Sequence, residues 1–235
     1  MRPILLLGLA ALLPTLLACE PEVVYSGSLM YEHLPLDAER TWRYANDSAE
    51  VAYELEVHKA ESWSSSDEQN VYVFQHSDAA TGDLLMEVGW SSDSLHGVLI
   101  HGYTVYDGPA GEGTSDSADT GGAGPVGDTV TYDPPVVFAD PRMVPGDVET
   151  TETGGRTFTS TFHSSEACPN HWTQEWNDCL RIELDDGDGD DTAGSVVAGT
   201  YWLVTRYGIA WFERTGDADK WVLRDHDCVK GGVEC

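Results

Sequence analysis

Alternation of apolar and polar residues constrains the fold of this chain more than any other feature. In VAYELEVHK, every second residue from Val51 to Val57 is apolar, while two glutamates and His58 fall on the opposite face. A period of two places successive side chains on opposite sides of a strand. The segment therefore predicts a half-buried strand of an antiparallel sheet.

Similar runs recur through the rest of the chain, with turn-forming residues between them. They include NVYVFQHS, LLMEVGW, LHGVLIHGYTVY, RTFTSTFHS, CLRIEL, YWLVTR, IAWFER and KWVLRD. After residue 19, convincing helical periodicity is lacking, and the one short candidate lies within residues 168–178. We predict an all-β domain of roughly ten short strands.

Two segments interrupt this pattern. The prolines of DPPVVFADPRMVPGD restrict that stretch to a sheet edge or a crossover. Residues 107–128 consist mainly of small and turn-forming residues, which predicts a flexible surface loop. The formal GxGxxG from Gly122 to Gly127 is rejected as a dinucleotide site, because it contains Pro125 and lacks a flanking strand and helix.

The first residues read as a leader. Arg2 precedes an apolar run that is shorter than the roughly 20 residues of a membrane-spanning helix. The run ends in Leu16-Leu17-Ala18-Cys19, which resembles the lipobox of bacterial lipoproteins. In that family a diacylglyceryl group is attached to the cysteine, and the leader is cut immediately before it. The resemblance implies a signal peptide over residues 1–18 and lipid attachment at Cys19.

This resemblance also implies a cellular location. The lipid would anchor the protein to the membrane of a bacterial cell envelope, since each buried methylene contributes about 0.8 kcal/mol. Residue 20 is Glu rather than the Asp of the inner-membrane retention signal, which favours the outer membrane. Residues 19–37 are expected to be a tether, and residues 38–235 a single antiparallel β domain.

The net charge of −29 limits the partners of the domain. Such a surface repels nucleic acid, whose binding needs clustered lysine and arginine. It also repels anionic membrane surfaces and suits a soluble, exported domain.

Four cysteines follow Cys19, and an even number in an exported chain predicts two disulfides. Three pairings are possible. Local pairing, which joins Cys168 to Cys179 and Cys228 to Cys235, is the simplest.

The acidic run DDGDGDD raises the question of a metal. Asp186, Asp188 and Asp190 have the spacing of the first three ligands of an EF-type calcium loop. Asp191 replaces the turn glycine of that loop, however, and Val197 replaces its closing glutamate. We interpret the run as a solvated hairpin loop with at most a weak calcium site, and we predict no other cofactor.

A catalytic motif of the HExxH, GxSxG, SxxK or Walker type is lacking. The eight tryptophans are more typical of a core and sheet faces than of a ligand box. A non-catalytic protein is therefore expected, although a scattered Ser/His/Asp triad leaves a hydrolase as an alternative.

The domain resembles a loose group of uncharacterised all-β envelope lipoproteins. The resemblance is carried by Trp42-Arg43-Tyr44, Tyr132-Asp133-Pro134-Pro135, Pro145-Gly146-Asp147 and the hairpin from Tyr201 to Ile209. It implies a curved antiparallel sheet like the half-barrels of lipoprotein carriers. Two functions follow as hypotheses: a structural or interaction role in the envelope, with an unknown protein partner, or carriage or sensing of an apolar, lipid-like ligand inside the sheet.

Changing Cys19→Ser should leave an uncut precursor without acyl label, because the serine hydroxyl cannot replace the thiol that the lipid transfer requires. Radiolabelled palmitate incorporation and the mass of the N-terminal peptide measure this. Normal cleavage and membrane retention of the variant would contradict the lipobox interpretation.

Overall fold

The computed structural model describes residues 29–46, 53–64, 70–106, 127–168, 179–187, 196–215, 220–230 and 232–234. These segments form thirteen strands and one short 3₁₀ helix, η1 (Met30–Glu32). The strands are β1 (Glu39–Asn46), β2 (Leu55–Ser64), β3 (Asn70–Asp78), β4 (Leu84–Asp93), β5 (Gly97–Tyr106), β6 (Gly127–Ala139), β7 (Val148–Thr153), β8 (Arg156–Glu166), β9 (Cys179–Asp185), β10 (Gly199–Val204), β11 (Gly208–Arg214), β12 (Lys220–Lys230) and β13 (Val233–Glu234).

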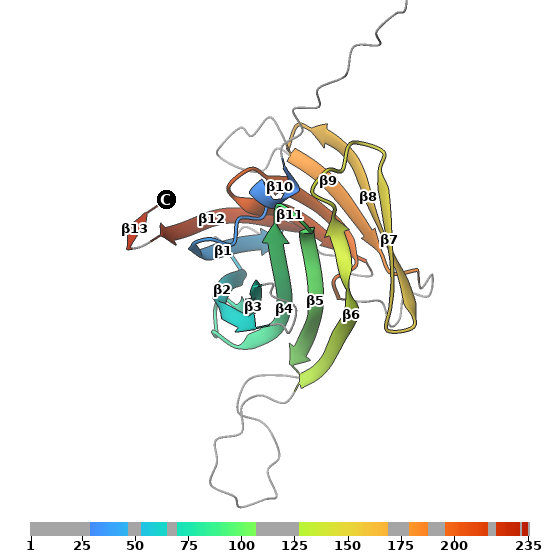
Figure 1. Ribbon diagram of the computed structural model, residues 1–235. Coiled ribbons are helices and arrows are strands. Elements are labelled where there is room, and N and C mark those ends of the chain that lie inside the picture. Colours follow the sequence, from blue (N-terminus) through green and yellow to red (C-terminus); the bar gives the residue numbers. More distant parts are fainter. Residues whose placement is uncertain are drawn as a thin grey trace, which may run out of the picture.

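Twelve strands lie side by side in the order β6-β5-β4-β3-β2-β1-β12-β11-β10-β9-β8-β7, and β13 adds a short pair to β12. Every pairing between neighbours is antiparallel. The sheet curls until β6 and β7 approach one another, which makes a nearly closed barrel (Figure 1). The all-β prediction is confirmed, with more strands and a more complete closure than a ten-stranded half-barrel.

The seam between β6 and β7 is closed by side chains instead of a ladder. Thr151 Oγ1 and Thr153 Oγ1 of β7 accept hydrogen bonds from the backbone N–H groups of Val137 and Asp133, at 3.0 and 2.9 Å. Ser160 donates to the carbonyl of Phe138 at 2.5 Å. β6 is an edge strand of the ladder, as its prolines predict, because proline lacks the N–H that a ladder needs.

Aromatic side chains fill the interior of the barrel. Trp42 is only 1% exposed and lies 5.0 Å from Phe74 between ring centroids. Trp90 and Phe138 meet edge to face at 5.2 Å, and Phe138 continues in the same way to Tyr201 at 5.1 Å. Edge-to-face contacts of this kind stabilise a core beyond the area that they bury.

The N-terminal segment, residues 29–38, differs from the tether expected over residues 19–37. Met30, Leu34 and Leu36 are buried in the main core, so the segment from Leu29 onwards belongs to the folded domain. The backbone N–H of Arg206 donates to Glu32, and Thr205 bonds His33 at 2.9 Å. Its apolar residues lack the period of a strand, and for this reason the sequence pattern did not reveal their burial.

A second, smaller apolar cluster includes the predicted disulfide. Cys168 and Cys179 are bonded, with 5.0 Å between their Cα atoms. Trp202 and Trp211 belong to the same cluster, with tilted rings whose centroids lie 5.2 Å apart. The indole N–H of Trp202 donates to Glu166 at 2.9 Å. The disulfide closes a loop of local sequence, as expected.

Thr151→Val should destabilise the protein by about 1–3 kcal/mol, because it leaves the N–H of Val137 without its acceptor at the seam. Urea unfolding measures this. The matched control is Thr150→Val on the exposed face of β7, for which a change within about 0.5 kcal/mol is expected. Equal effects of the two variants would show that the side-chain seam contributes nothing.

Candidate functional site

A cavity lined by core residues of the barrel is too small for a lipid-like ligand. It measures about 30 Å³, and Phe74, Trp90 and Phe212 are among the side chains around it. A space of this size holds about one water molecule. His76 and Arg214 add a polar end, where their nitrogens lie 3.4 Å apart. Burial, and then the charge of Arg214, hold the pKa of His76 well below its ordinary value, so this histidine is neutral.

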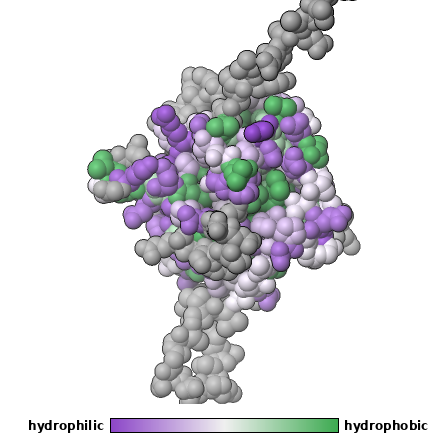
Figure 2. Space-filling view, viewed as in Figure 1, coloured by the Kyte–Doolittle hydropathy of each residue, from purple (hydrophilic) through white to green (hydrophobic). Residues whose placement is uncertain are grey.

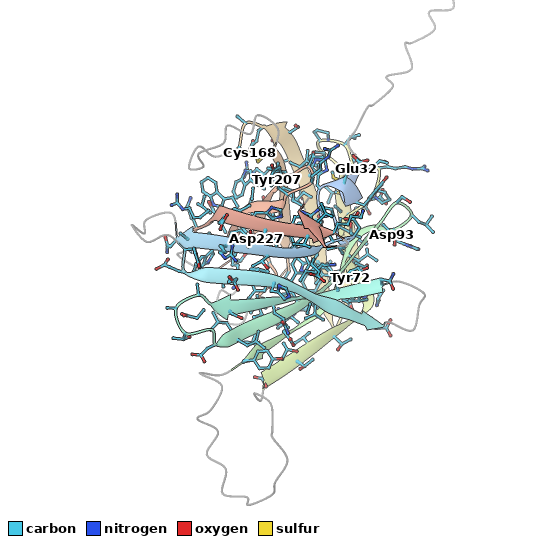
Figure 3. The ribbon with its side chains drawn as sticks, turned by 90° about the vertical axis from the view of Figure 1, so that its left-hand side faces the viewer. Glu32, Tyr72, Asp93, Cys168, Tyr207 and Asp227 are labelled. Atoms are coloured by element: carbon cyan, nitrogen blue, oxygen red, sulfur yellow. A yellow bond between two sulfur atoms is a disulfide. The ribbon has the colours of Figure 1, made fainter. Side chains whose placement is uncertain are left out.

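A much larger space is open and lies where the N-terminal segment meets the strands. This cleft measures about 1220 Å³ and is lined by residues of the N-terminal segment, β1, β3, β4, β12 and the β10–β11 turn. Figure 3 shows Glu32, Asp93 and Tyr72 along that side of the molecule, which faces the viewer in Figure 1. Figure 2 shows hydrophilic residues spread over this face, with smaller hydrophobic patches between them.

Strand periodicity carries polar side chains into the cleft. On β1, Arg40 lies on the same inward face as Trp42 and Tyr44, but at the end of the barrel. On β3, Tyr72 lies on the same inward face as Phe74, nearer the end of the barrel. The register of β1 and β12 pairs Trp42 with His226, so His226 also faces inward.

Arg40 is the most buried cation of the cleft, at 6% exposure. Its Nη1 donates to the carbonyl oxygen of Arg206 at 2.8 Å and lies 3.1 Å from Nε2 of His226. Burial, and then the charge of Arg40, lower the pKa of His226 to about 4. His226 is therefore neutral at pH 7 and can accept the hydrogen bond, but it offers no negative charge to Arg40.

Lys59 lies behind the wall of the cleft and is also buried, at 8% exposure. Its Nζ donates to the carbonyl of Leu36 at 2.8 Å and lies 4.2 Å from the centre of the Tyr72 ring. Burial lowers the pKa of Lys59, and the neighbouring charge of Arg40 lowers it further. The end of the barrel thus holds two buried cations in a strongly acidic protein.

The carboxylates of the cleft lie nearer its rim. Asp37 pairs with Lys230 at 2.5 Å, and this hydrogen bond lowers the pKa of Asp37. Asp225 bonds Arg43 at 3.0 Å on the outer face of β1. Among the described residues, neither Arg40 nor Lys59 has a carboxylate within ion-pair distance.

A serine–histidine pair borders this region. Ser91 Oγ lies 2.8 Å from Nε2 of His101, a distance at which a histidine can act as a base. Ser91 is among the residues that line the cleft, and it is 2% exposed, while His101 is 9% exposed. The hydrolase alternative stays a hypothesis.

The structure does not bring the sequence-predicted site residues together. Asp186 is 2% exposed and its carboxylate bonds Arg156 at 3.2 Å, while Asp188 and Asp190 lie outside the described residues. The described segments contain no cluster of side chains suited to a metal. Cys19 also lies outside them, and the calcium and lipid sites stay predictions.

The second predicted disulfide is only partly in view. Cys228 is disulfide-bonded, to a cysteine outside the described residues. β13 pairs Val233 with Lys230 and Glu234 with Val229, which is the register that a Cys228–Cys235 bond requires. That pairing stays a prediction.

Sequence reasoning missed Arg40 and Lys59, although a signal was present. Lys59 continues the alternation of Leu55 and Val57, and Arg40 precedes that of Trp42 and Tyr44, so both fall on the apolar face. A cation at the end of an inward-facing series indicates a polar barrel end.

Comparisons of the chain with protein-family models, curated proteins and solved structures found no match. None of the described residues belongs to a helix that is long and apolar enough to cross a membrane.

The free energy of unfolding should fall as the pH falls from 6.5 toward 4. In this range His226 is protonated in the unfolded state, where its pKa is 6.5, but stays neutral in the folded state, where its pKa is about 4. After allowance for solvent screening of this half-buried ring, His226→Gln should remove about 1 kcal/mol of that loss. Urea unfolding at several pH values measures the slope. His58→Gln, at an exposed position of β2, is the control, and an unchanged slope in His226→Gln would contradict the assignment.

Proposed function

We propose that this protein is a non-catalytic bacterial envelope lipoprotein that binds a polar ligand in the cleft at the end of its barrel. The observation that carries the proposal is the contrast between the two spaces. The interior is filled by aromatic side chains around a cavity of about 30 Å³, whereas the cleft measures about 1220 Å³ and combines charged and polar residues with apolar ones. Ligand sites are concave and combine a few polar groups with aromatic ones, and the cleft has Tyr31, Tyr72 and Tyr207 among its lining.

The position of the cleft fits a tethered protein. Tyr31 and Glu32 line it, so the N-terminal segment forms part of its wall. Nine residues lie between Cys19 and Leu29, where the described structure begins, so ten Cα–Cα steps join them. At full extension they reach no more than about 36 Å. With a lipid at Cys19, the cleft would work close to the membrane surface.

The alternative of an apolar-ligand carrier finds no support in this geometry. A lipid-like ligand needs an apolar cavity of several hundred Å³. The interior cavity is smaller by an order of magnitude, and the cleft has four carboxylates and three cations among its lining residues. An interaction role therefore has the better physical support.

A thermal-unfolding screen tests the proposal, with sugars, amino acids, dipeptides and phosphates as separate classes. Asn70 is exposed and lines the cleft, so Asn70→Trp should block it without disturbing the core. Leu85→Trp, at an exposed position away from the cleft, is the matched control.

At least one class should stabilise wild type and Leu85→Trp but not Asn70→Trp. Ligand at a hundred times its Kd stabilises by about 2.7 kcal/mol, which a melting temperature reports clearly. Binding in the cleft would be refuted if a ligand still stabilised Asn70→Trp, or if no class of ligand stabilised the wild-type protein.

A further inference from the structure

Two buried cations of the described structure, Arg40 and Lys59, have no carboxylate at ion-pair distance. Arg40 and Lys59 are both more than nine-tenths buried, and their hydrogen bonds go to neutral carbonyls and a neutral histidine. Removing a charge from water is costly unless it is paired. In a chain of net charge −29, acidic side chains are abundant, yet those of the described residues act on these two cations only from beyond contact distance. Burial lowers the pKa of both cations by more than the charge of Asp37 raises it, and the charge of Glu39 also raises the pKa of Lys59.

One edge of the Arg40 guanidinium is buried and, among the described residues, unpartnered, and its geometry indicates which group would pair with it. Its Nη1 is occupied by Arg206 and His226, but its buried Nε lacks a hydrogen-bond partner. The described residues place no hydrogen bond on Nη2 either, and Arg40 lines the cleft. Nε and Nη2 form one straight edge of the guanidinium, which matches the two oxygens of a carboxylate.

We propose that Arg40 is a specificity-determining residue that binds the carboxylate of a short peptide or amino acid in the cleft. The ligand supplies a carboxylate in direct contact with Arg40, which no described residue does, and Lys59 adds attraction from behind Tyr72. This inference rests on the proposed function of the cleft and names the chemistry of its ligand.

The rim of the cleft favours a zwitterion over a strongly charged anion. Four carboxylates, those of Glu32, Asp37, Asp93 and Asp225, line it beside the cations Arg40, Arg206 and Lys230. These acids repel a phosphate dianion, whereas they attract the ammonium group of an amino acid or peptide. The volume of about 1220 Å³ exceeds that of most small-molecule sites and has room for a short peptide.

Glycylglycine, its C-terminal amide and inorganic phosphate are the probes for the test. They are titrated into the purified full-length protein at pH 7 and constant ionic strength. Calorimetry measures affinity, and the Nε–H signal of Arg40 in ¹⁵N spectra reports contact at that atom. Glycylglycine should bind and shift this signal, and the amide and phosphate should do neither.

Two variants locate the contact. Arg40→Gln should weaken glycylglycine binding about tenfold or more, because a charge-assisted bidentate pair is lost. Lys230→Gln, which removes an exposed cation of the same cleft, should change affinity by less than about threefold. If Arg40→Gln does not fold, the Nε–H signal of wild type, assigned through Arg40→Lys, decides the question alone.

Equal binding of glycylglycine and its amide, binding of phosphate alone, or undiminished binding by a folded Arg40→Gln would overturn this inference. The proposed function survives such a result if another class of ligand still stabilises the protein in a way that Asn70→Trp abolishes. Both fail together only if blocking the cleft affects no ligand at all.

Discussion

The pairing of β1 with β12 is the interaction on which the rest of the structure depends. It joins strands at opposite ends of the described sequence, and it divides the sheet into β2–β6 on one side and β7–β11 on the other. Arg43 stabilises this strand pair on its outer face, with hydrogen bonds of 2.9, 3.0 and 2.8 Å to Glu56, Asp225 and Asp227. Without this pairing, the hydrogen-bonded ladder would be divided into two sheets, β2–β6 with β1 and β7–β11 with β12.

The same register builds the candidate site. Because Arg40 pairs with Cys228 and Trp42 with His226, the inward faces of the two strands meet at the end of the barrel. Trp42 ties this end to the β10–β11 turn by donating its indole N–H to the carbonyl of Tyr207 at 2.5 Å. Gly208 follows with φ of +93°, where a Cβ atom would lie 3.3 Å from that indole nitrogen. The turn therefore lies close against Trp42 because its second residue is glycine.

Much of the fold could be predicted from the sequence because local rules suffice for strands and hairpins. Turns at Gly154-Gly155 and Tyr207-Gly208 give the hairpins β7–β8 and β10–β11, as expected. Closure of the barrel could not be predicted in this way, because it depends on the summed twist and register of twelve strands. No local sequence pattern encodes the approach of Thr151 in β7 to Val137 in β6. The same limit applies to the N-terminal segment, whose Leu34 is buried through contacts with distant strands.

The candidate site was harder to predict than the fold, because what distinguishes it is that no described carboxylate contacts Arg40. A buried arginine beside an aspartate would be an ordinary structural pair, and the sequence offers many aspartates. Asp37, three residues from Arg40, forms its ion pair with Lys230 at the surface instead, and its charge acts on Arg40 only from a distance. The fold thus keeps a positive charge in its wall at a cost to its own stability. A cost of this kind is typical of groups retained for function, because a well-packed apolar residue at such a position usually stabilises a protein at least as well.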